Sequence, residues 1–180
     1  MIEVSIPLQP GPIQSVAGKW TTDGDGPSAV FTHDGTRWTA KQGYPLALFR
    51  QPENFTGGTV WLDFKLIGGS DDYSAGLVFG HRGTSYYYVR YNTKDGNVAL
   101  WRMDGPKRTV IKHGEAHAQL PKGEWHRLQL RLDGRKVRAS VGHLTVEHEL
   151  DEPVSGRLGL WTKPDVTSAF RNLQVSESRH

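Results

Sequence analysis

The chain contains no cysteine, which excludes disulfides, thiolate zinc sites and cysteine nucleophiles. It also lacks any apolar run near the roughly 18 residues of a membrane-spanning helix, so no membrane partner is expected. The first residues, MIEVS, lack the basic-then-apolar layout of a signal peptide. We therefore expect a cytoplasmic protein, or a periplasmic or secreted one if the sequence begins after a cleaved signal peptide.

A concentrated charge of one sign is missing as well. The 22 Lys and Arg residues face 19 Asp and Glu, a net charge of +3, and the basic residues are scattered along the chain. Nucleic-acid binding needs a basic patch or stripe, so the sequence predicts no nucleic-acid partner. At 180 residues the chain is expected to be a single domain, residues 1–180.

No segment keeps a helical period over three turns, although residues 115–120 could form one short helical turn. Four Asp-Gly pairs, at 34–35, 95–96, 104–105 and 133–134, instead predict tight hairpins. The ends, residues 1–11 and 176–180, are expected to be loosely held. Strands are predicted over residues 28–33, 36–41, 45–50, 59–67, 74–82, 85–93, 97–103, 108–113, 125–133, 135–141, 144–150, 156–161 and 169–175.

Several of these strands alternate apolar and polar residues. Leu128, Leu130 and Leu132, for example, alternate with arginine and glutamine. Because successive side chains of a strand point to opposite faces, such a strand has one dry and one wet face. The sequence therefore predicts an all-β fold, a two-sheet antiparallel jelly-roll β-sandwich.

The strand 85–93 is the most informative segment. Tyr86, Tyr88, Arg90 and Asn92 share one face, while Tyr87, Val89 and Tyr91 share the other. A face that offers rings, a guanidinium and an amide is either a solvated sheet face or a platform for a polar ligand. Of the six tryptophans, Trp38 and Trp125 are expected in the core, whereas Trp61 falls on the wet face of its strand.

The segments Ala75-Gly-Leu-Val-Phe79, Tyr86-Tyr-Tyr-Val-Arg-Tyr-Asn92 and Gly159-Leu-Trp-Thr-Lys-Pro-Asp165 carry a family resemblance. Over residues 36–176 the chain resembles the laminin-G-like, concanavalin A-like jelly-roll domains of bacteria. It is also similar to the related 3-keto-disaccharide hydrolase domain family, whose relatives include glycoside hydrolase family 16. The resemblance implies two curved antiparallel sheets with a carbohydrate site on the concave face.

The candidate ligand-binding residues combine this resemblance with the alternation of the strands. Rings stack on sugar faces while charged and amide groups bind hydroxyls, so a sugar site mixes the two. Arg90 needs a counterpart, which we expect to be an acidic sugar, solvent or a carboxylate such as Asp165. The predicted site consists of Tyr88, Arg90, Asn92, Trp101, Trp161, Lys163 and Asp165, with His81 at its margin.

Catalysis stays open at this point. Glycoside hydrolysis uses a pair of carboxylates, and the closely spaced acids, Glu147 with Glu149 and Asp71 with Asp72, are interpreted as a solvent-facing strand and a turn. The catalytic carboxylate pattern of the hydrolase relatives is also missing. We expect non-catalytic sugar binding, with a glycoside or 3-keto-disaccharide hydrolase and a laminin-G-like protein-interaction module as the alternatives.

No cofactor is expected apart from a structural calcium. The string Asp23-Gly-Asp25-Gly resembles part of a calcium loop, although it lacks the remaining ligands of an EF-hand. Jelly-roll domains related to this one often hold a structural calcium, so Asp23 and Asp25 are the candidate metal ligands. The sequence names neither the sugar nor the oligomeric state.

Overall fold

The computed structural model describes residues 2–69 and 72–178, and almost all of the regular structure in them is β. Three short 3-10 helices, η1 (Gly26–Ser28), η2 (Gly35–Arg37) and η3 (Ala40–Gln42), accompany the strands. None of the helices in this described part is long and apolar enough to cross a membrane. The strands are β1 (Glu3–Ile6), β2 (Ile13–Ala17), β3 (Trp20–Asp23), β4 (Val30–His33), β5 (Leu46–Phe49), β6 (Gly57–Gly68), β7 (Ser74–Arg82), β8 (Ser85–Asn92), β9 (Asn97–Asp104), β10 (Lys107–His113), β11 (Trp125–Asp133), β12 (Lys136–Val141), β13 (Leu144–Glu149), β14 (Arg157–Thr162) and β15 (Thr167–Glu177).

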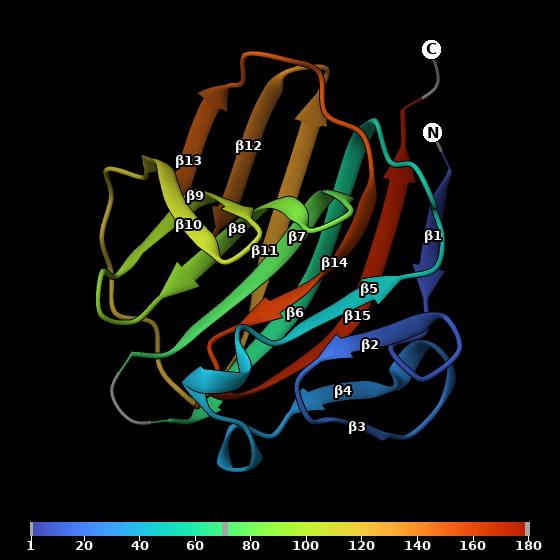
Figure 1. Cartoon of the computed structure of the whole chain (residues 1–180), viewed down its shortest axis with the longest axis vertical. Helices are drawn as coiled ribbons and strands as arrows, with labels where there is room; N and C mark the ends of the chain where they lie inside the picture. Colours follow the sequence, from blue (N-terminus) through green and yellow to red (C-terminus); the bar gives the residue numbers. More distant parts are fainter. Residues whose placement is uncertain (1, 70–71, 179–180) are drawn as a thin grey trace.

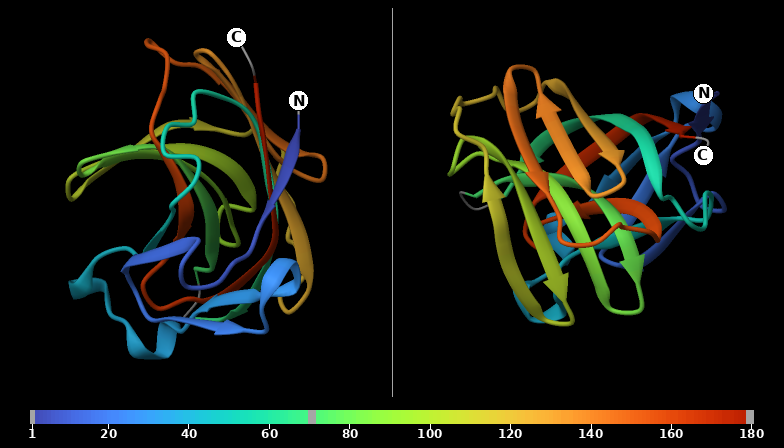
Figure 2. Two further views of the ribbon diagram at one scale, coloured as in Figure 1. Left: turned by 90° about the vertical axis from the view of Figure 1, so that its right-hand side faces the viewer. Right: turned by 90° about the horizontal axis from the view of Figure 1, so that it is seen from above.

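The strands form two antiparallel sheets, which confirms the predicted all-β sandwich. Sheet A has eight strands in the order β13-β12-β11-β6-β15-β4-β3, with β1 paired to the other end of β15. Sheet B has seven strands in the order β10-β9-β8-β7-β14-β5-β2. In Figure 1 the molecule is viewed onto sheet B, with sheet A behind it. Figure 2 shows that sheet B is curved, with its outer face on the concave side.

The core lies between the sheets because each strand turns its apolar residues inward. On β11, Leu128, Leu130 and Leu132 are at most 1% exposed while the arginines and glutamine between them face solvent. On β8, Val89 and Tyr91 point into the same core. The alternation of β8 therefore sends Tyr86, Tyr88, Arg90 and Asn92 to the outer face of sheet B, as the sequence predicts.

Three of the four Asp-Gly pairs form the predicted hairpins, between β8 and β9, β9 and β10, and β11 and β12. Gly134 has φ of 61°, a left-handed conformation that residues other than glycine rarely adopt. The fourth pair is different, because the strand predicted over residues 36–41 is wrong. Asp34 accepts hydrogen bonds from the backbone and hydroxyl of Thr36, which favours the 3-10 turn η2 over an extended chain.

Three other expectations about local structure also fail. Residues 115–120 form no helical turn, and their chain is held instead by long-range bonds such as that from the Leu120 N–H to the Tyr91 hydroxyl. The N-terminal segment is not loosely held throughout, since β1 pairs with β15 over residues 3–6. Trp38 and Trp125 are not core residues: Trp38 donates to the Gly43 carbonyl in a surface loop, and Trp125 lies on the outer face of sheet A.

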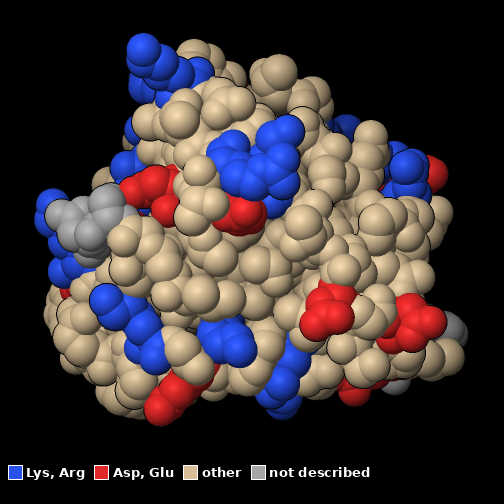
Figure 3. Space-filling view, turned by 90° about the horizontal axis from the view of Figure 1, so that it is seen from below, with Lys and Arg blue, Asp and Glu red and all other residues tan. Residues whose placement is uncertain are grey.

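Charged residues on the surface are mixed in sign. Figure 3 shows one face of the molecule, where Lys and Arg side chains lie among Asp and Glu with no continuous stripe of either sign. This mixture on the visible face is typical of a solvated surface.

Candidate functional site

A second apolar cluster lies outside the core, on the outer face of sheet B. Its buried members are Leu46, Leu48, Val78, Tyr86, Tyr88, Met103 and Trp161, with the half-buried Tyr44 and Trp101 packed against them. The strand register places them together, because Tyr88 pairs with Trp101 on β9 and with Val78 on β7. We call the rings of Tyr44, Tyr86, Tyr88, Trp101 and Trp161 the aromatic floor.

The rings of the floor stack across the strands. Trp161 and Tyr88 lie 4.2 Å apart between ring centroids, and both are 0% exposed. Tyr44 stacks on Trp161 at 5.3 Å from one side, and Trp101 lies parallel to Tyr88 at 6.3 Å on the other. Gly76 makes this possible, since a Cβ there would come within 3.1 Å of the Arg90 Cβ and 3.4 Å of the Trp161 ring.

Arg108 of β10 covers part of the floor. Its guanidinium carbon lies 4.4 Å from the Trp101 ring centroid and 5.2 Å from that of Tyr44. Tyr44 belongs to the loop before β5, whereas Trp101 and Arg108 belong to the β9–β10 hairpin. One cation therefore joins two half-exposed rings that come from distant parts of the sequence.

The polar groups of the floor differ in how they are partnered. The Tyr88 hydroxyl interacts with Arg108 and the Tyr86 hydroxyl with the Trp161 indole, whereas the buried indole N–H of Trp101 has no hydrogen-bond partner. Burial raises the pKa values of the Tyr86 and Tyr88 hydroxyls, so both remain protonated at neutral pH. A buried group left without a partner costs about 1–3 kcal/mol, so the Trp101 indole is a weakly satisfied donor at the margin of the floor.

Arg90 projects from the outer face but is only 2% exposed. Its guanidinium donates to the Asp95 carboxylate at 2.9 Å and to the Asn97 side chain at 2.9 Å, both at the β8–β9 turn. Its counterpart is therefore Asp95 in place of the expected Asp165. Arg90 fixes the hairpin and lies 5.5 Å from the Trp101 ring, beneath the rim of the floor.

Asn92 and Lys163 meet through a residue that the sequence interpretation treated as part of a turn. The Asp72 carboxylate accepts hydrogen bonds from the Asn92 amide and the Lys163 ammonium. Burial raises the pKa of Asp72, but these bonds outweigh it and hold the pKa below its usual range. Asp165 lies in a separate turn, where its backbone is so close to Gly35 that a Cβ on Gly35 would clash with it at 2.4 Å.

His81 lies at the other end of the floor, stacked on Tyr86 at 5.7 Å. It lines a hollow of about 390 Å³, the end hollow, formed by Leu48, Glu53, Asn54, His81, Arg82, Gly83, Gly156 and Arg157. Burial, with the nearby positive charge of Arg157, lowers the pKa of His81, so the ring is neutral at pH 7. Leu48 belongs to both the end hollow and the cluster of the floor, so the two are continuous.

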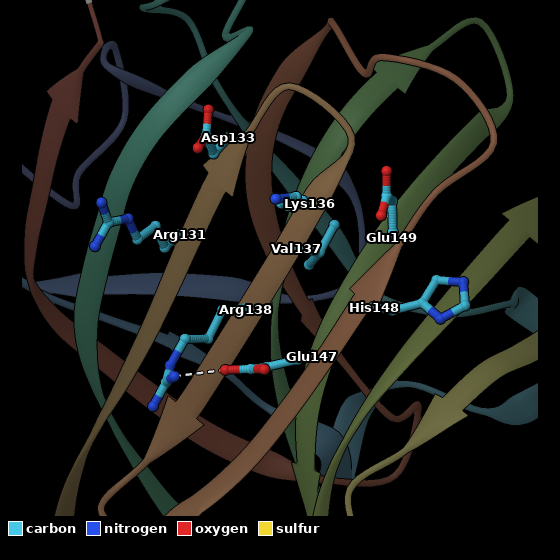
Figure 4. A pocket seen from close by; sticks show the side chains of 8 residues that line it. All are labelled: Arg131, Asp133, Lys136, Val137, Arg138, Glu147, His148 and Glu149. Carbon is cyan, nitrogen blue, oxygen red and sulfur yellow. Dashed lines mark hydrogen bonds and ion pairs between the residues drawn. The ribbon is translucent and has the colours of Figure 1, made fainter.

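A hollow of about 460 Å³ on the outer face of sheet A has a different character (Figure 4). Glu147 pairs with Arg138 and Glu149 with Arg135, and both glutamates are exposed, which confirms that they face solvent. His148 points away from them in Figure 4. No aromatic ring other than His148 lines this hollow, so it offers no stacking surface.

The proposed calcium ligands lie apart from the floor. Asp23 ends β3 and Asp25 precedes η1. Within residues 2–69 and 72–178, no group of three or more His, Cys, Asp or Glu side chains is arranged to hold a metal ion. The structural calcium at Asp23 and Asp25 stays a prediction.

The sequence interpretation missed Tyr44 and Arg108. The Asp104-Gly105 hairpin is a signal that could have assigned Arg108 to the floor. In the register of this hairpin Arg108 pairs with Met103, so Arg108 shares a face with Trp101. Tyr44 carried no such signal, since it lies in an irregular loop after η3 whose position depends on long-range packing. The structure does bring Tyr88, Arg90, Trp101 and Trp161 together as expected.

Known structures share this architecture. A carbohydrate binding module, CBM66 from Bacillus subtilis, superposes with a TM-score of 0.73 at 16% identity, covering 92% of this chain and 96% of that one. A galectin-like-fold protein from Bacillus subtilis gives a TM-score of 0.66 at 17% identity, with coverage of 98% and 95%. The beta-glucanase of Bacillus licheniformis gives 0.59 at 11% identity, with coverage of 99% and 98%.

No family profile and no curated protein sequence matches the chain. At these low identities the structural likeness shows the fold alone, which is the jelly-roll sandwich that binding modules and glycan-cleaving enzymes share.

Proposed function

We propose that the protein binds carbohydrate, without cleaving it, on the outer face of sheet B. The observation that carries the proposal is the pair of half-buried rings, Tyr44 and Trp101, which share contacts with the Arg108 guanidinium beside the stacked Tyr88 and Trp161. Sugars present apolar C–H faces that pack on rings and oxygen atoms that accept hydrogen bonds. A sugar over Tyr44 and Trp101 would pack on these rings and accept hydrogen bonds from Arg108.

The likeness of the fold to that of a carbohydrate binding module supports this proposal. The end hollow and the cluster of the floor share Leu48 and together extend over several strands, which suits an oligosaccharide chain better than a single small ligand. The rim provides further polar groups through Asn92 and Lys163.

Hydrolysis lacks comparable support. A glycosidase needs two carboxylates flanking the scissile bond, one of them able to give up a proton. On this face Asp72 is bound by Lys163 and Asn92, and Asp95 is bound by Arg90. Both acids are therefore held as ion-paired carboxylates at the edge of the floor, which suits structural roles.

A glycan array followed by calorimetry tests the proposal. Trp101→Ala should weaken binding of the best glycan by about 1–2 kcal/mol, because it removes both a stacking ring and a donor. Trp61→Ala is the matched control, since Trp61 is also a half-buried tryptophan but lies on sheet A.

Three outcomes separate the alternatives. Equal losses in the two variants would place the site elsewhere. Absence of any glycan ligand, together with capture of a defined protein partner that Trp101→Ala abolishes, would favour the protein-interaction module. Release of reducing ends from the bound glycan would favour the hydrolase.

A further inference from the structure

The charges on the outer face of sheet B do not balance. The two acids at the edge of the floor are already matched, Asp95 by Arg90 and Asp72 by Lys163. Arg108 at one side of the floor and Arg157 in the end hollow take part in none of the ion pairs found among the described residues. The face therefore has more positive than negative charge even when Glu53 of the end hollow is counted.

Arg108 is held in a position suited to a ligand. Two rings, Tyr44 and Trp101, lie with their centroids 5.2 and 4.4 Å from the carbon of its guanidinium. Ring contacts of this kind use the π-faces of the aromatics and not the N–H groups, which can still donate to an oxygen. Arg108 is half-buried, so part of its side chain remains open to solvent.

The polar group that Arg108 offers is a donor only. Its guanidinium has five N–H groups in a planar fork and no acceptor. A neutral sugar hydroxyl both donates and accepts, so its own hydrogen would find no acceptor on this guanidinium. A carboxylate or sulfate accepts two parallel hydrogen bonds from the fork and also balances its charge.

The end hollow also favours an anionic ligand. Its volume of about 390 Å³ is within the range of ligand pockets, and Arg82 and Arg157 outnumber its one acid, Glu53. Arg82 donates to Ser155, whereas Arg157 has no carboxylate partner among the described residues. A ligand that reaches from Arg108 to Arg157 would meet a positive charge at each end of an apolar floor.

We propose that the ligand of this face is an acidic sugar chain, with Arg108 as the residue that selects its anionic group. This inference rests on the proposed function and deepens it. The guanidinium would bind a carboxylate or sulfate ester through two parallel hydrogen bonds, while Tyr44 and Trp101 pack on the neighbouring sugar ring.

The test uses sugar chains that differ only in charge. Calorimetry at about 0.15 M salt compares oligogalacturonate with its neutral methyl ester, and dextran sulfate with dextran, so that long-range attraction is screened. We expect the acidic member of one pair to bind about tenfold more tightly or better, the range of a charge-assisted hydrogen bond. The pair that shows the preference identifies the anion as a carboxylate or a sulfate.

Substitution at Arg108 assigns the preference to that residue. Arg108→Gln should reduce acidic binding by about tenfold and change neutral binding less than twofold. Arg108→Lys should recover only part of the preference, because the ammonium lacks the planar fork. Arg131→Gln, which removes an exposed arginine from sheet A, is the matched control and should change neither affinity.

Two results would overturn the inference. Equal affinity for the acidic and neutral chains would remove it while leaving the proposed function intact. A preference that survives Arg108→Gln with a normal melting temperature would remove Arg108 from the role. Failure of all four chains and of the glycan array would instead overturn the proposed function itself.

Discussion

The two outer faces of the sandwich use the same residue types in opposite ways. On sheet A, Trp61 and Trp125 are covered by cations, with Arg127 3.7 Å from the Trp61 ring and Arg171 4.0 Å from the Trp125 ring. Arg127 and Arg171 both pair with Asp63, which is 7% exposed. The Trp61 indole N–H donates to Glu3 at 2.6 Å.

On sheet B the rings stack on one another, and Arg108 pairs with no acid. Trp161 and Tyr88 are fully buried by neighbouring side chains, while Arg108 contacts the half-buried rings of Tyr44 and Trp101 and takes part in none of the ion pairs of the described residues. Arginine and tryptophan alone therefore do not mark a site. The two faces differ in whether an acid of the protein balances the arginine that covers the rings.

The largest effect should come from Trp161, because its ring supports the aromatic floor. Trp161→Ala should lower the free energy of unfolding by about 3–5 kcal/mol, the usual cost of truncating a buried tryptophan. Urea unfolding measures it, and Trp61→Ala on sheet A should cost less than about half as much. A similar loss of unfolding free energy for the two variants would show that the tryptophans of the two outer faces are equally well packed.

Asp63 provides the next test, on sheet A. Asp63→Ala should lower the free energy of unfolding by about 1.5–3 kcal/mol, because Arg127, Arg171 and Asn172 lose a charged acceptor. Asn172 lies at the register shift of β15 with φ of 57°, and its amide donates to Asp63 at 2.8 Å, so this irregular part of the strand would also be less well held. Glycan binding should be unaffected, and a loss of affinity would link sheet A to the site.

Gly76 tests the close packing of the floor. Gly76→Ala places a methyl group 2.8 Å from the Val89 carbonyl oxygen and between Arg90 and Trp161, which should cost about 1–3 kcal/mol of stability through overpacking. Gly68→Ala at the end of β6 is the control, because its Cβ would have no atom within 4 Å and its φ is not in the left-handed region. Thermal unfolding measures the stability of both variants. Equal shifts of the two melting temperatures would argue against close packing at Gly76.

The smallest effect concerns pH and His33, which lies inside the sandwich, unlike the partly exposed His81. Burial lowers the pKa of His33 below its usual value of 6.5, although its ring nitrogen Nδ1 lies 2.8 Å from the Val166 carbonyl and Nε2 has no partner. The unfolded chain then takes up a proton more readily than the folded one. The contribution of His33 is fully present above about pH 6.5 and is lost as the pH falls through that value.

Unfolding curves measured between pH 7.5 and about pH 5 should show this loss, and His33→Gln should flatten it. A slope unchanged by the substitution would assign the acid sensitivity to another group.

The sequence predicts the sandwich well because its signals are local. The inward leucines of β11 and the Asp-Gly turn at 133–134 each depend on neighbouring residues only. The same local rule fails at Asp34-Gly35, where a side-chain bond to Thr36 and close packing on Asp165 decide the conformation. Turn chemistry identifies where the chain turns but does not identify what surrounds the turn.

The candidate site is only partly predictable for the same reason. Tyr88 and Arg90 are assigned to one face by alternation, but alternation does not show that Arg90 is buried against Asp95. The partnership of Lys163 with Asp72 joins positions 91 residues apart, which no sequence spacing indicates. The contacts of Tyr44 with Trp161 and Arg108 emerge only from the packing of several strands.

The pairing of β1 with β15 has a practical consequence for protein engineering. Glu3 lies opposite Ser176 in adjacent antiparallel strands, and Figures 1 and 2 show β1 beside the end of β15. A short peptide could therefore join residues 3 and 176, and new ends could be opened at the exposed Gly142 turn between β12 and β13. Such a circular permutant should keep the sandwich. Both new ends would lie in sheet A, so the protein could be immobilised through them while the aromatic floor of sheet B stays accessible.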